Sequence, residues 1–258
     1  MQILLTNDDG IYAPGLAALE HQLLKMGDVT VAAPLMEQSG VGHSITYLTP
    51  LMARKVFDAA GQQRGWAVEG SPADCVKLAV SELCPARPDL VVSGINSGLN
   101  AGINVLYSGT VAAAIEGAFF GITSVAVSLE YDDAARYEAA AEKAAAIIGQ
   151  VLAQPTAERR LYNLNIPHQA IDTEAAVHVV PVATAPWSED FEKRKDPRGR
   201  SYYWATGVAP NPPSDIETDL SALRAGHITL TPLQFDMTHR DQLEQMRSWQ
   251  LGPAMTRT

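Results

Sequence analysis

The stretch Ile3-Leu4-Leu5-Thr6-Asn7-Asp8-Asp9-Gly10 joins a short apolar run to two adjacent carboxylates and a glycine. Gln2 to Leu5 shows no alternation of apolar and polar residues, which is typical of a strand buried on both faces of a parallel sheet. Asp8 and Asp9 then follow the carboxyl end of that strand at a sharp turn, where their charges repel each other unless a cation is bound. The stretch therefore predicts a divalent-metal site at the end of the first strand.

The residues that follow complete a β-α-β unit. Leu16, Leu19 and Leu23 recur at helical spacing, and Asp28 to Ala33 reads as a second buried strand. This order indicates an α/β fold with a parallel sheet. The turn of the unit lacks Gly-x-Gly-x-x-Gly, and no Gly-x-x-x-x-Gly-Lys-Ser/Thr occurs in the sequence, so dinucleotide and P-loop sites lose their main support.

Length and composition are those of one globular unit. The chain has 258 residues, of which 47% are hydrophobic, and we expect a single domain over residues 1–258. The formal charge of −10 argues against binding of polymeric nucleic acid, because that needs a basic face. No apolar stretch reaches about 18 residues and no signal peptide precedes Asp8, so we expect no membrane span and a cytoplasmic location.

The two cysteines are expected to be reduced. Ser71-Pro72-Ala73-Asp74 is a helix-start signature, with a capping serine, proline at the first helical position and an acidic residue in the first turn. Cys75 and Cys84 would share that helix, and their nine-residue separation places them about 13 Å apart. A disulfide needs Cα atoms within about 7 Å.

The loop Glu37 to Ser44 follows the second strand at its carboxyl end, where open α/β sheets place their ligands. Ser39 and His43 are therefore candidate site residues. The alternative for each is a turn residue that hydrogen-bonds to its own backbone. Residues 45 to 70 suggest a β-hairpin.

A second polar loop follows a strand predicted over Asp89 to Ser93. The loop, Gly94 to Asn104, holds three glycines and three asparagines, a composition that lets backbone N–H groups point inward and hold a phosphate. Ser108 can then cap a helix, so that a phosphate at Ser108-Gly109-Thr110 would meet unsatisfied N–H groups at the positive end of the helix dipole. The alternative is a long turn followed by an ordinary N-cap. The expected core face of the helix is Val111, Ala114, Ile115, Ala118 and Phe119.

Polar groups thus follow successive strands: Asp8 and Asp9, then Ser39, then Asn96. These oxygen ligands suit Mg²⁺ or Mn²⁺ better than zinc. Such an ion could polarise a phosphoryl oxygen and lower the pKa of an attacking water. The sequence therefore predicts metal-assisted phosphate chemistry.

The C-terminal half of the chain contains fewer sequence motifs that indicate catalysis or binding. Ala134 to Leu152 reads as an alanine-rich helix, with Ala141, Ala145, Ile148 and Leu152 on one face. Trp187 to Arg200 is strongly charged and is followed by Tyr202-Tyr203-Trp204, which we interpret as an arm or hairpin for subunit contact. The alternative is a lid that stacks a base on an aromatic ring.

Several of these motifs together resemble the SurE survival-protein family. They are Ile3 to Gly10, Gln38-Ser39-Gly40, Ser93 to Asn100, Tyr107 to Gly117, Asn163-Leu164-Asn165-Ile166-Pro167, and Thr218-Asp219 with Thr231-Pro232-Leu233.

The resemblance implies a metal-dependent 5'(3')-nucleotidase that acts on nucleoside monophosphates and on short polyphosphate, with a role in stationary-phase survival. It implies a Rossmann-like three-layer core over about residues 1–182 and a C-terminal arm over about 183–258 that builds dimers or tetramers. Carried over by motif, Asp8, Asp9, Ser39 and Asn96 would bind one divalent ion per subunit. Asn96, Ser97, Gly98, Ser108, Gly109 and Thr110 would contact the phosphate, and Asp8, Asp9 and Asn96 would be catalytic.

The mechanism that follows is direct attack of a metal-activated water on phosphorus, with His43 as a weak candidate for the general acid. One rival is a haloacid-dehalogenase-like phosphatase, which needs a nucleophilic and an acidic aspartate two positions apart, whereas Asp8 and Asp9 are adjacent. The other rival is a non-catalytic nucleotide sensor that uses the same ligands without hydrolysis.

Overall fold

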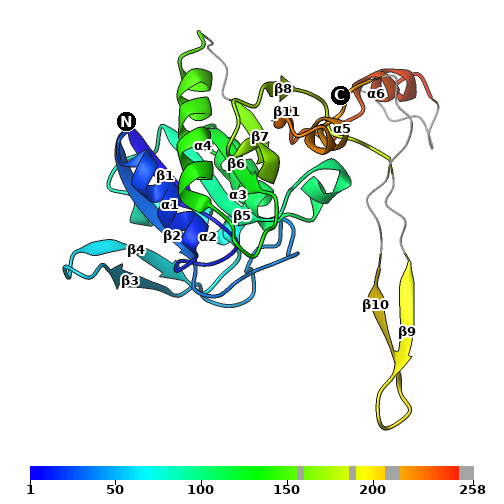
Figure 1. Ribbon diagram of the computed structural model, residues 1–258, viewed down its shortest axis with the longest axis horizontal. Coiled ribbons are helices and arrows are strands. Elements are labelled where there is room, and N and C mark those ends of the chain that lie inside the picture. Colours follow the sequence, from blue (N-terminus) through cyan, green and yellow to red (C-terminus); the bar gives the residue numbers. More distant parts are fainter. Residues whose placement is uncertain (156–159, 186–189, 207–215, 250–258) are drawn as a thin grey trace, which may run out of the picture.

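The central element of the fold is a nine-stranded sheet with helices on both faces, in a computed structural model that describes residues 1–155, 160–185, 190–206 and 216–249 (Figure 1). The strands of this sheet are β1 (Gln2–Thr6), β2 (Asp28–Pro34), β3 (Ala53–Phe57), β4 (Gln63–Val68), β5 (Leu90–Ser97), β6 (Thr123–Leu129), β7 (Leu161–Ile166), β8 (Val177–Val179) and β11 (Ile228–Leu233). The helices are α1 (Pro14–Leu23), α2 (Pro72–Leu78), α3 (Gly109–Phe119), α4 (Tyr137–Leu152), α5 (Asp219–Arg224) and α6 (Arg240–Met246), with short helical turns η1 (Ala79–Leu83), η2 (Gly102–Leu106) and η3 (His168–Ala170).

The strand order is β3-β4-β2-β1-β5-β6-β7-β11-β8. Every neighbouring pair from β4 to β7 is parallel, whereas β3 pairs antiparallel with β4 and β11 antiparallel with β7. The α/β fold with a mainly parallel sheet, expected from the sequence, is confirmed, and β3 with β4 forms the hairpin expected within residues 45 to 70.

Successive residues of β1 are buried against different helices. Ile3 and Leu5 belong to the apolar layer that contains Leu16 and Leu19 of α1 together with Ile148 of α4. Leu4, between them, packs in the layer formed with α2 and α3. Burial on both faces explains the uninterrupted apolar run at the N-terminus.

The connections of the chain reverse direction between β1 and β5. From β1 the chain proceeds to β2 and β4 on one side, and from β5 it proceeds to β6 and β7 on the other. In open α/β sheets the crevice outside the carboxyl ends of two such strands is the usual ligand site. Asp8 and Asp9 follow β1 at this crevice, and Asn96 lies at the end of β5.

The strand expected to end at Ser93 continues to Ser97, with a register irregularity between Ser93 and Asn96. Gly94 allows this because its φ is +147° and an added Cβ would lie 2.4 Å from the carbonyl oxygen of Val127. The extension means that Asn96 is held by sheet hydrogen bonding rather than by a loop.

Three expectations about helices need correction. Phe119 is 52% exposed because it lies in the last turn of α3, where it contacts His43 and Phe235 instead of the sheet. Helix α4 begins at Tyr137 rather than Ala134; of the expected face Ala141 and Ile148 are buried, whereas Ala145 and Leu152 are only partly buried, and the buried residues also include Ala140, Ala144 and Ile147. Helix α2 ends at Leu78 and is followed by a π-helical turn; Cys84 comes after that turn, and both cysteines are free thiols as expected.

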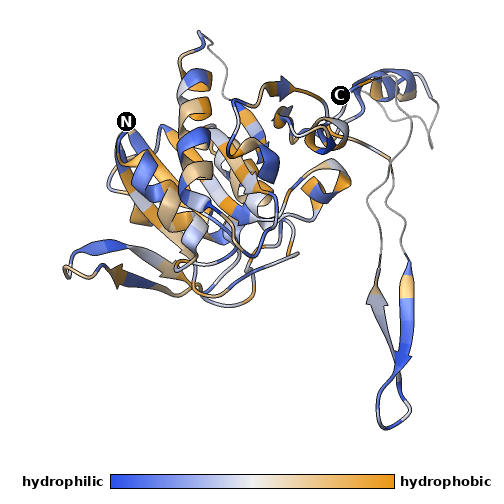
Figure 2. Cartoon of the chain, viewed as in Figure 1, coloured by the Kyte–Doolittle hydropathy of each residue, from blue (hydrophilic) through white to orange (hydrophobic). Residues whose placement is uncertain are grey.

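Strands β9 (Phe191–Lys195) and β10 (Ser201–Ala205) form a separate antiparallel hairpin. All ten residues are exposed, the hairpin stands away from the nine-stranded sheet (Figure 1), and β9 is mostly hydrophilic (Figure 2). The hairpin is as expected, its role in subunit contact stays a prediction, and Trp187 lies outside the described residues. Within the described part of the chain, no helix has the length and apolar character needed to cross a membrane.

Candidate functional site

The turn after β1 is closed by the side chain of Asn7. Its Oδ1 accepts a hydrogen bond from the backbone N of Gly10 at 3.2 Å, and its Nδ2 donates to the carbonyl oxygen of the same residue at 3.0 Å. Gly10 adopts φ +101°, which a residue with a side chain rarely does. This turn directs Asp8 and Asp9 toward different elements of the fold.

Asp8 lies against the N-terminus of α3 and is only 6% exposed. The hydroxyl of Thr110 donates to Asp8 Oδ1. Burial raises the pKa of Asp8, and the Thr110 hydrogen bond opposes that rise. Gly109 allows the close approach, because an added Cβ would lie 2.9 Å from Asp8 Cβ. The side chain of Thr110, predicted to touch phosphate, therefore holds a carboxylate in place.

Asp9 lies against the end of β5. Its Oδ2 accepts a hydrogen bond from the backbone N of Ser97 at 3.2 Å. Burial, together with the negative charge of Asp8, raises the pKa of Asp9 to about 6. Nearby, Asn96 Nδ2 donates to the carbonyl oxygen of Gly98 at 2.7 Å, which fixes the orientation of the amide.

The loop after β2 brings Ser39 to the same place. The backbone N of Gln38 donates to the carbonyl oxygen of Asp8 at 2.8 Å, so the loop is tied directly to the β1 turn. Ser39 Oγ donates to Glu37 Oε1 at 2.5 Å. The charge of Glu37 also contributes to the raised pKa values of Asp8 and Asp9.

His43 occupies a different environment. Its Nε2 lies 2.8 Å from Oε2 of the buried Glu116, and its ring stacks on Phe119 at 5.5 Å between centroids. It is not among the residues that line the cavity around Asp8 and Asp9. Among the described residues His43 therefore joins the loop to α3 outside the cavity, and its role as a general acid stays a prediction.

These elements enclose a cavity of about 500 Å³. Its lining residues are Asp8, Asp9, Glu37, Ser39, Gly40, Asn96, Ser97, Gly98, Leu99, Asn100, Asn104, Tyr107, Ser108 and Tyr131. The four predicted metal ligands thus lie in one cavity with Ser97, Gly98 and Ser108. Gly109 and Thr110 do not line it and lie behind Asp8.

Helix α3 begins at the wall of this cavity. Ser108 Oγ accepts a hydrogen bond from the backbone N of Val111 at 3.1 Å, which confirms the predicted N-cap. The first N–H groups of a helix have no partner within the helix, and this end carries the positive part of the helix dipole. An anion in the cavity would meet both features.

A network of buried asparagines holds the loop after β5, which lines the cavity. The carbonyl oxygen of Asn100 accepts hydrogen bonds from the side chains of Asn163 at 2.7 Å and Asn165 at 3.1 Å, both on β7. The backbone N of Asn100 donates to Asn165 Oδ1 at 2.8 Å. These contacts fix the loop after β5 and explain why two asparagines occupy a central strand.

The donor set fits a hard divalent cation. Asp8, Asp9, Ser39 and Asn96 offer only oxygen ligands, two of them carboxylates. Among the described residues neither carboxylate has an ion-pair partner, and no three His, Cys, Asp or Glu side chains gather closely enough to hold a metal by themselves. Two adjacent carboxylates with raised pKa values and no positive neighbour are stabilised when a cation binds.

Comparison with known proteins identifies the family. A family model described as survival protein SurE matches residues 3–189. The chain belongs to the SurE family. A protein from Rhodopirellula baltica named 5'-nucleotidase SurE is 56% identical over 254 residues, covering 98% of this chain and 100% of that protein.

Two further relatives support the assignment. A 5'-nucleotidase SurE from Carboxydothermus hydrogenoformans is 44% identical, covering 96% of both chains. The crystal structure of the SurE protein from Aquifex aeolicus superimposes with a TM-score of 0.83 at 35% identity, covering 96% of this chain and 98% of that one. The resemblance seen in the motifs of this SurE chain is thereby confirmed.

Sequence reasoning missed several residues of the cavity. Glu37 lies two positions before Ser39, and Tyr131 lies two residues beyond the end of β6, at the same sheet edge as the predicted residues. A search for polar residues just beyond the carboxyl end of every predicted strand would have found Tyr131. Nothing in the sequence pattern distinguishes Glu37 from an ordinary exposed loop residue.

Proposed function

We propose that this SurE protein is a phosphoric monoester hydrolase that removes phosphate from nucleoside monophosphates. The observation that supports this most directly is the pairing of Asp8 and Asp9, two carboxylates without an ion-pair partner among the described residues, with the N-terminus of α3 in one cavity. The names of the relatives from R. baltica and C. hydrogenoformans agree with this proposal. Short polyphosphate carries the same terminal group and is a second candidate substrate.

One Mg²⁺ or Mn²⁺ ion per subunit would be held by Asp8, Asp9, Ser39 and Asn96. When bound, such an ion polarises a phosphoryl oxygen and lowers the pKa of a water molecule. Asp8 is suited to be a fixed ligand, because Thr110 and the close packing of Gly109 hold its carboxylate. Asn96, whose Nδ2 is bonded to Gly98, would present its Oδ1.

The phosphate would be seated between Asn96 and the start of α3. Ser108 caps the helix and lines the cavity, so the anion would face the start of α3, where the helix dipole is positive, while the backbone N–H of Thr110 hydrogen-bonds to Asp8. Asp9, less buried than Asp8 and with a pKa raised to about 6, is the carboxylate suited to orient the attacking water. Attack on phosphorus would then release the nucleoside without a covalent intermediate.

Phosphate release from AMP or GMP in the presence of Mn²⁺ tests the proposal. We expect turnover that a chelator abolishes and that Asp8→Asn reduces by several orders of magnitude. The matched control is Asp28→Asn, which changes an exposed aspartate at the amino end of β2, the opposite edge of the sheet. Metal-independent turnover would contradict the proposed metal site, and nucleotide binding without any hydrolysis would favour a sensor.

We also propose that the hairpin β9–β10 is the arm that joins subunits into a dimer or tetramer. Its exposed Phe191, Tyr203 and Trp204 are apolar groups that a partner surface could cover. Replacing residues 191–205 by a short Gly-Ser linker should lower the mass measured by light scattering. An unchanged mass would assign subunit contact to another surface. The cytoplasmic location and the absence of polymeric nucleic acid as a partner stay predictions.

A further inference from the structure

A second cavity of about 220 Å³ adjoins the phosphate site. Its lining is mostly apolar and consists of Leu99, Ala101, Asn104, Glu130, Leu220, Leu223 and Arg224. Leu99 and Asn104 line both cavities, so the two lie side by side. We propose that this second cavity binds the nucleobase of the substrate, an inference that rests on the proposed nucleotidase function.

The position of the cavity suits a nucleotide whose phosphate lies at the start of α3. Asn104 of η2 lines both cavities, and Ser108, the cap of α3, lines the phosphate site. The ribose of such a nucleotide would lie beside Asn104, between its phosphate and its base.

The wall of the cavity is fixed by a buried carboxylate. Asp219, at the start of α5, is fully buried; its Oδ2 accepts a hydrogen bond from the backbone N of Gly102 and its Oδ1 one from that of Ala183, both at 2.8 Å. A Cβ on Gly102 would lie 3.0 Å from Leu220 Cδ1, so η2 and α5 are in close contact. The cavity is therefore largely preformed, as sites for small ligands usually are.

The chemistry of the lining suits a nucleobase. Leu220 and Leu223 present apolar surface to the flat faces of a ring, and Leu223 is only 6% exposed. Glu130 is oriented by a hydrogen bond from the backbone N of His168 to its Oε2 at 2.7 Å. Its Oε1, which has no hydrogen bond within the described residues, can accept one from a ring N–H or an exocyclic amine.

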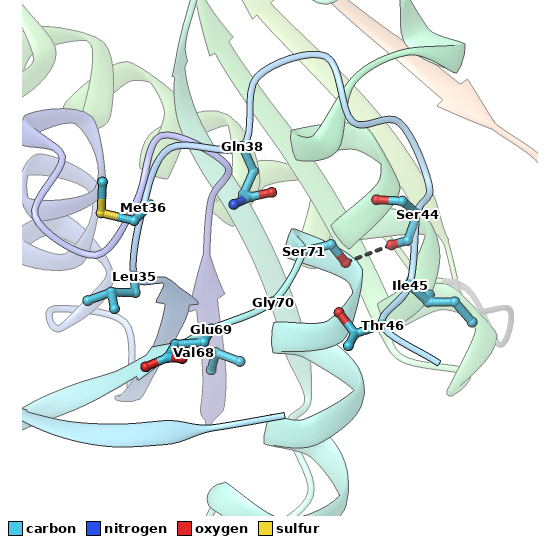
Figure 3. Close-up of a pocket in the computed structure, with 10 residues that line it drawn as sticks. All are labelled: Leu35, Met36, Gln38, Ser44, Ile45, Thr46, Val68, Glu69, Gly70 and Ser71. Carbon is cyan, nitrogen blue, oxygen red and sulfur yellow. Dashed lines mark hydrogen bonds between the residues drawn. The ribbon is translucent and has the colours of Figure 1, made fainter. Parts of the chain in front are cut away.

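Another cavity, of about 570 Å³, lies beside the loop after β2 and the segment that leads into α2 (Figure 3). It is lined by Leu35, Met36, Gln38, Ser44, Ile45, Thr46, Val68, Glu69, Gly70 and Ser71. It shares no lining residue with the phosphate site. The residues that the smaller cavity shares with the phosphate site therefore favour the smaller cavity, and Ile45 provides a matched control in the larger one.

The test compares AMP with ribose 5-phosphate, which has no base, for Leu220→Ala, Ile45→Ala and the wild type with Mn²⁺. Loss of apolar contact should lower kcat/KM for AMP about tenfold in Leu220→Ala. Turnover of ribose 5-phosphate by that variant, and turnover of both substrates by Ile45→Ala, should stay within about twofold of wild type. Leu220→Met, which keeps the side-chain volume, should restore AMP turnover.

An equal loss on both substrates would overturn the inference, and so would a selective loss of AMP turnover in Ile45→Ala. Calorimetric binding of adenosine provides a measurement that needs no turnover. Its affinity should fall about tenfold in Leu220→Ala, and an unchanged affinity would also overturn the inference. Adenosine binding that depends on Leu220, in a wild type that releases no phosphate, would refute the nucleotidase function and leave the base site standing.

Discussion

Replacement of Thr110 by valine tests how Asp8 is prepared to bind a cation. Thr110 is fully buried and its hydroxyl donates to Asp8, so valine keeps the shape and removes only the hydrogen bond. A hydrogen bond to a charged group contributes about 1.5–3 kcal/mol. At about 1.4 kcal/mol per tenfold, the loss corresponds to a factor of roughly 10 to 100 in affinity. We expect the dissociation constant of Mn²⁺ to rise by that factor.

The environment of Asp8 explains why the dissociation constant of Mn²⁺ should rise rather than fall. Burial already raises the pKa of this carboxyl, and the Thr110 hydrogen bond is the largest contribution that lowers it. Without that bond the pKa rises further, so protons compete more strongly with the cation for this carboxylate. The carboxylate also loses the contact that orients it, and such outer contacts typically change metal affinity by about 10- to 100-fold.

The assay is calorimetric titration of Mn²⁺ into the metal-free protein at neutral pH, with Thr110→Ser as the control that keeps the hydroxyl. Phosphate release from AMP as a function of Mn²⁺ concentration provides an independent measure. Wild-type Mn²⁺ affinity combined with a higher KM for AMP would refute the reasoning. That pattern would mean that the Thr110 hydroxyl contacts phosphate, as the sequence motif suggests.

Three further predictions concern Gly109, Asp9 and Asp74. Gly109→Ala places a Cβ 2.9 Å from Asp8 Cβ and should lower the free energy of unfolding in urea by about 1–3 kcal/mol along with phosphate release; unchanged stability would contradict the packing. Asp9 has a folded-state pKa of about 6 against an ordinary 3.8, so its contribution to stability is present below pH 4 and lost as the pH rises through 6. In the presence of a chelator, the unfolding temperature of the wild type should therefore fall between pH 4 and pH 6 by more than that of Asp9→Asn. Equal falls, measured by calorimetry, would refute the raised pKa of Asp9 as the cause. Asp74 accepts hydrogen bonds from the backbone N of Ser71 and the hydroxyl of Thr46, so Asp74→Ala should lose about 2–4 kcal/mol in urea unfolding, more than Asp74→Asn; equal losses would argue against both contacts.

The sequence is sufficient to predict which strand ends form the site. Uninterrupted apolar runs identify buried parallel strands, and parallel strands present their carboxyl ends at one edge of the sheet. Asp8 and Ser39 follow β1 and β2, Asn96 lies at the end of β5, and the structure brings all three to one cavity. Ser108 as N-cap of α3 is also predictable, because capping depends on local residue types.

What the sequence could not predict depends on contacts between distant segments. The bond from Thr110 to Asp8 spans 102 positions, and only the packing of α3 against the β1 turn makes it possible. The continuation of β5 to Ser97 depends on the close approach of Val127 to Gly94, where a Cβ would lie 2.4 Å from the carbonyl oxygen of Val127. Phe119 fits the apolar period of α3, yet the last turn of that helix faces the loop of His43 rather than the sheet.

The partners of the two aspartates also bear on the covalent alternative. A phosphatase with an aspartate nucleophile needs that carboxylate and a second acidic group facing the substrate together. Here both carboxylates line the same cavity, and each is held by a different element: Asp8 by Thr110 of α3 and Asp9 by the backbone of Ser97 in β5.

Water attack predicts where the oxygen of the reaction ends. In a single turnover of AMP in H₂¹⁸O, the label should appear in the released phosphate, and peptides containing Asp8 and Asp9 should remain unlabelled in mass spectra. Acid quenching during turnover should likewise trap no phosphoryl group on the protein. A phosphorylated Asp8 or Asp9, or ¹⁸O in either carboxylate, would refute direct attack. If an acyl phosphate formed and were hydrolysed at the carbonyl carbon, solvent oxygen would stay on the enzyme. In direct attack, the oxygen from water bonds only to phosphorus and leaves with the product.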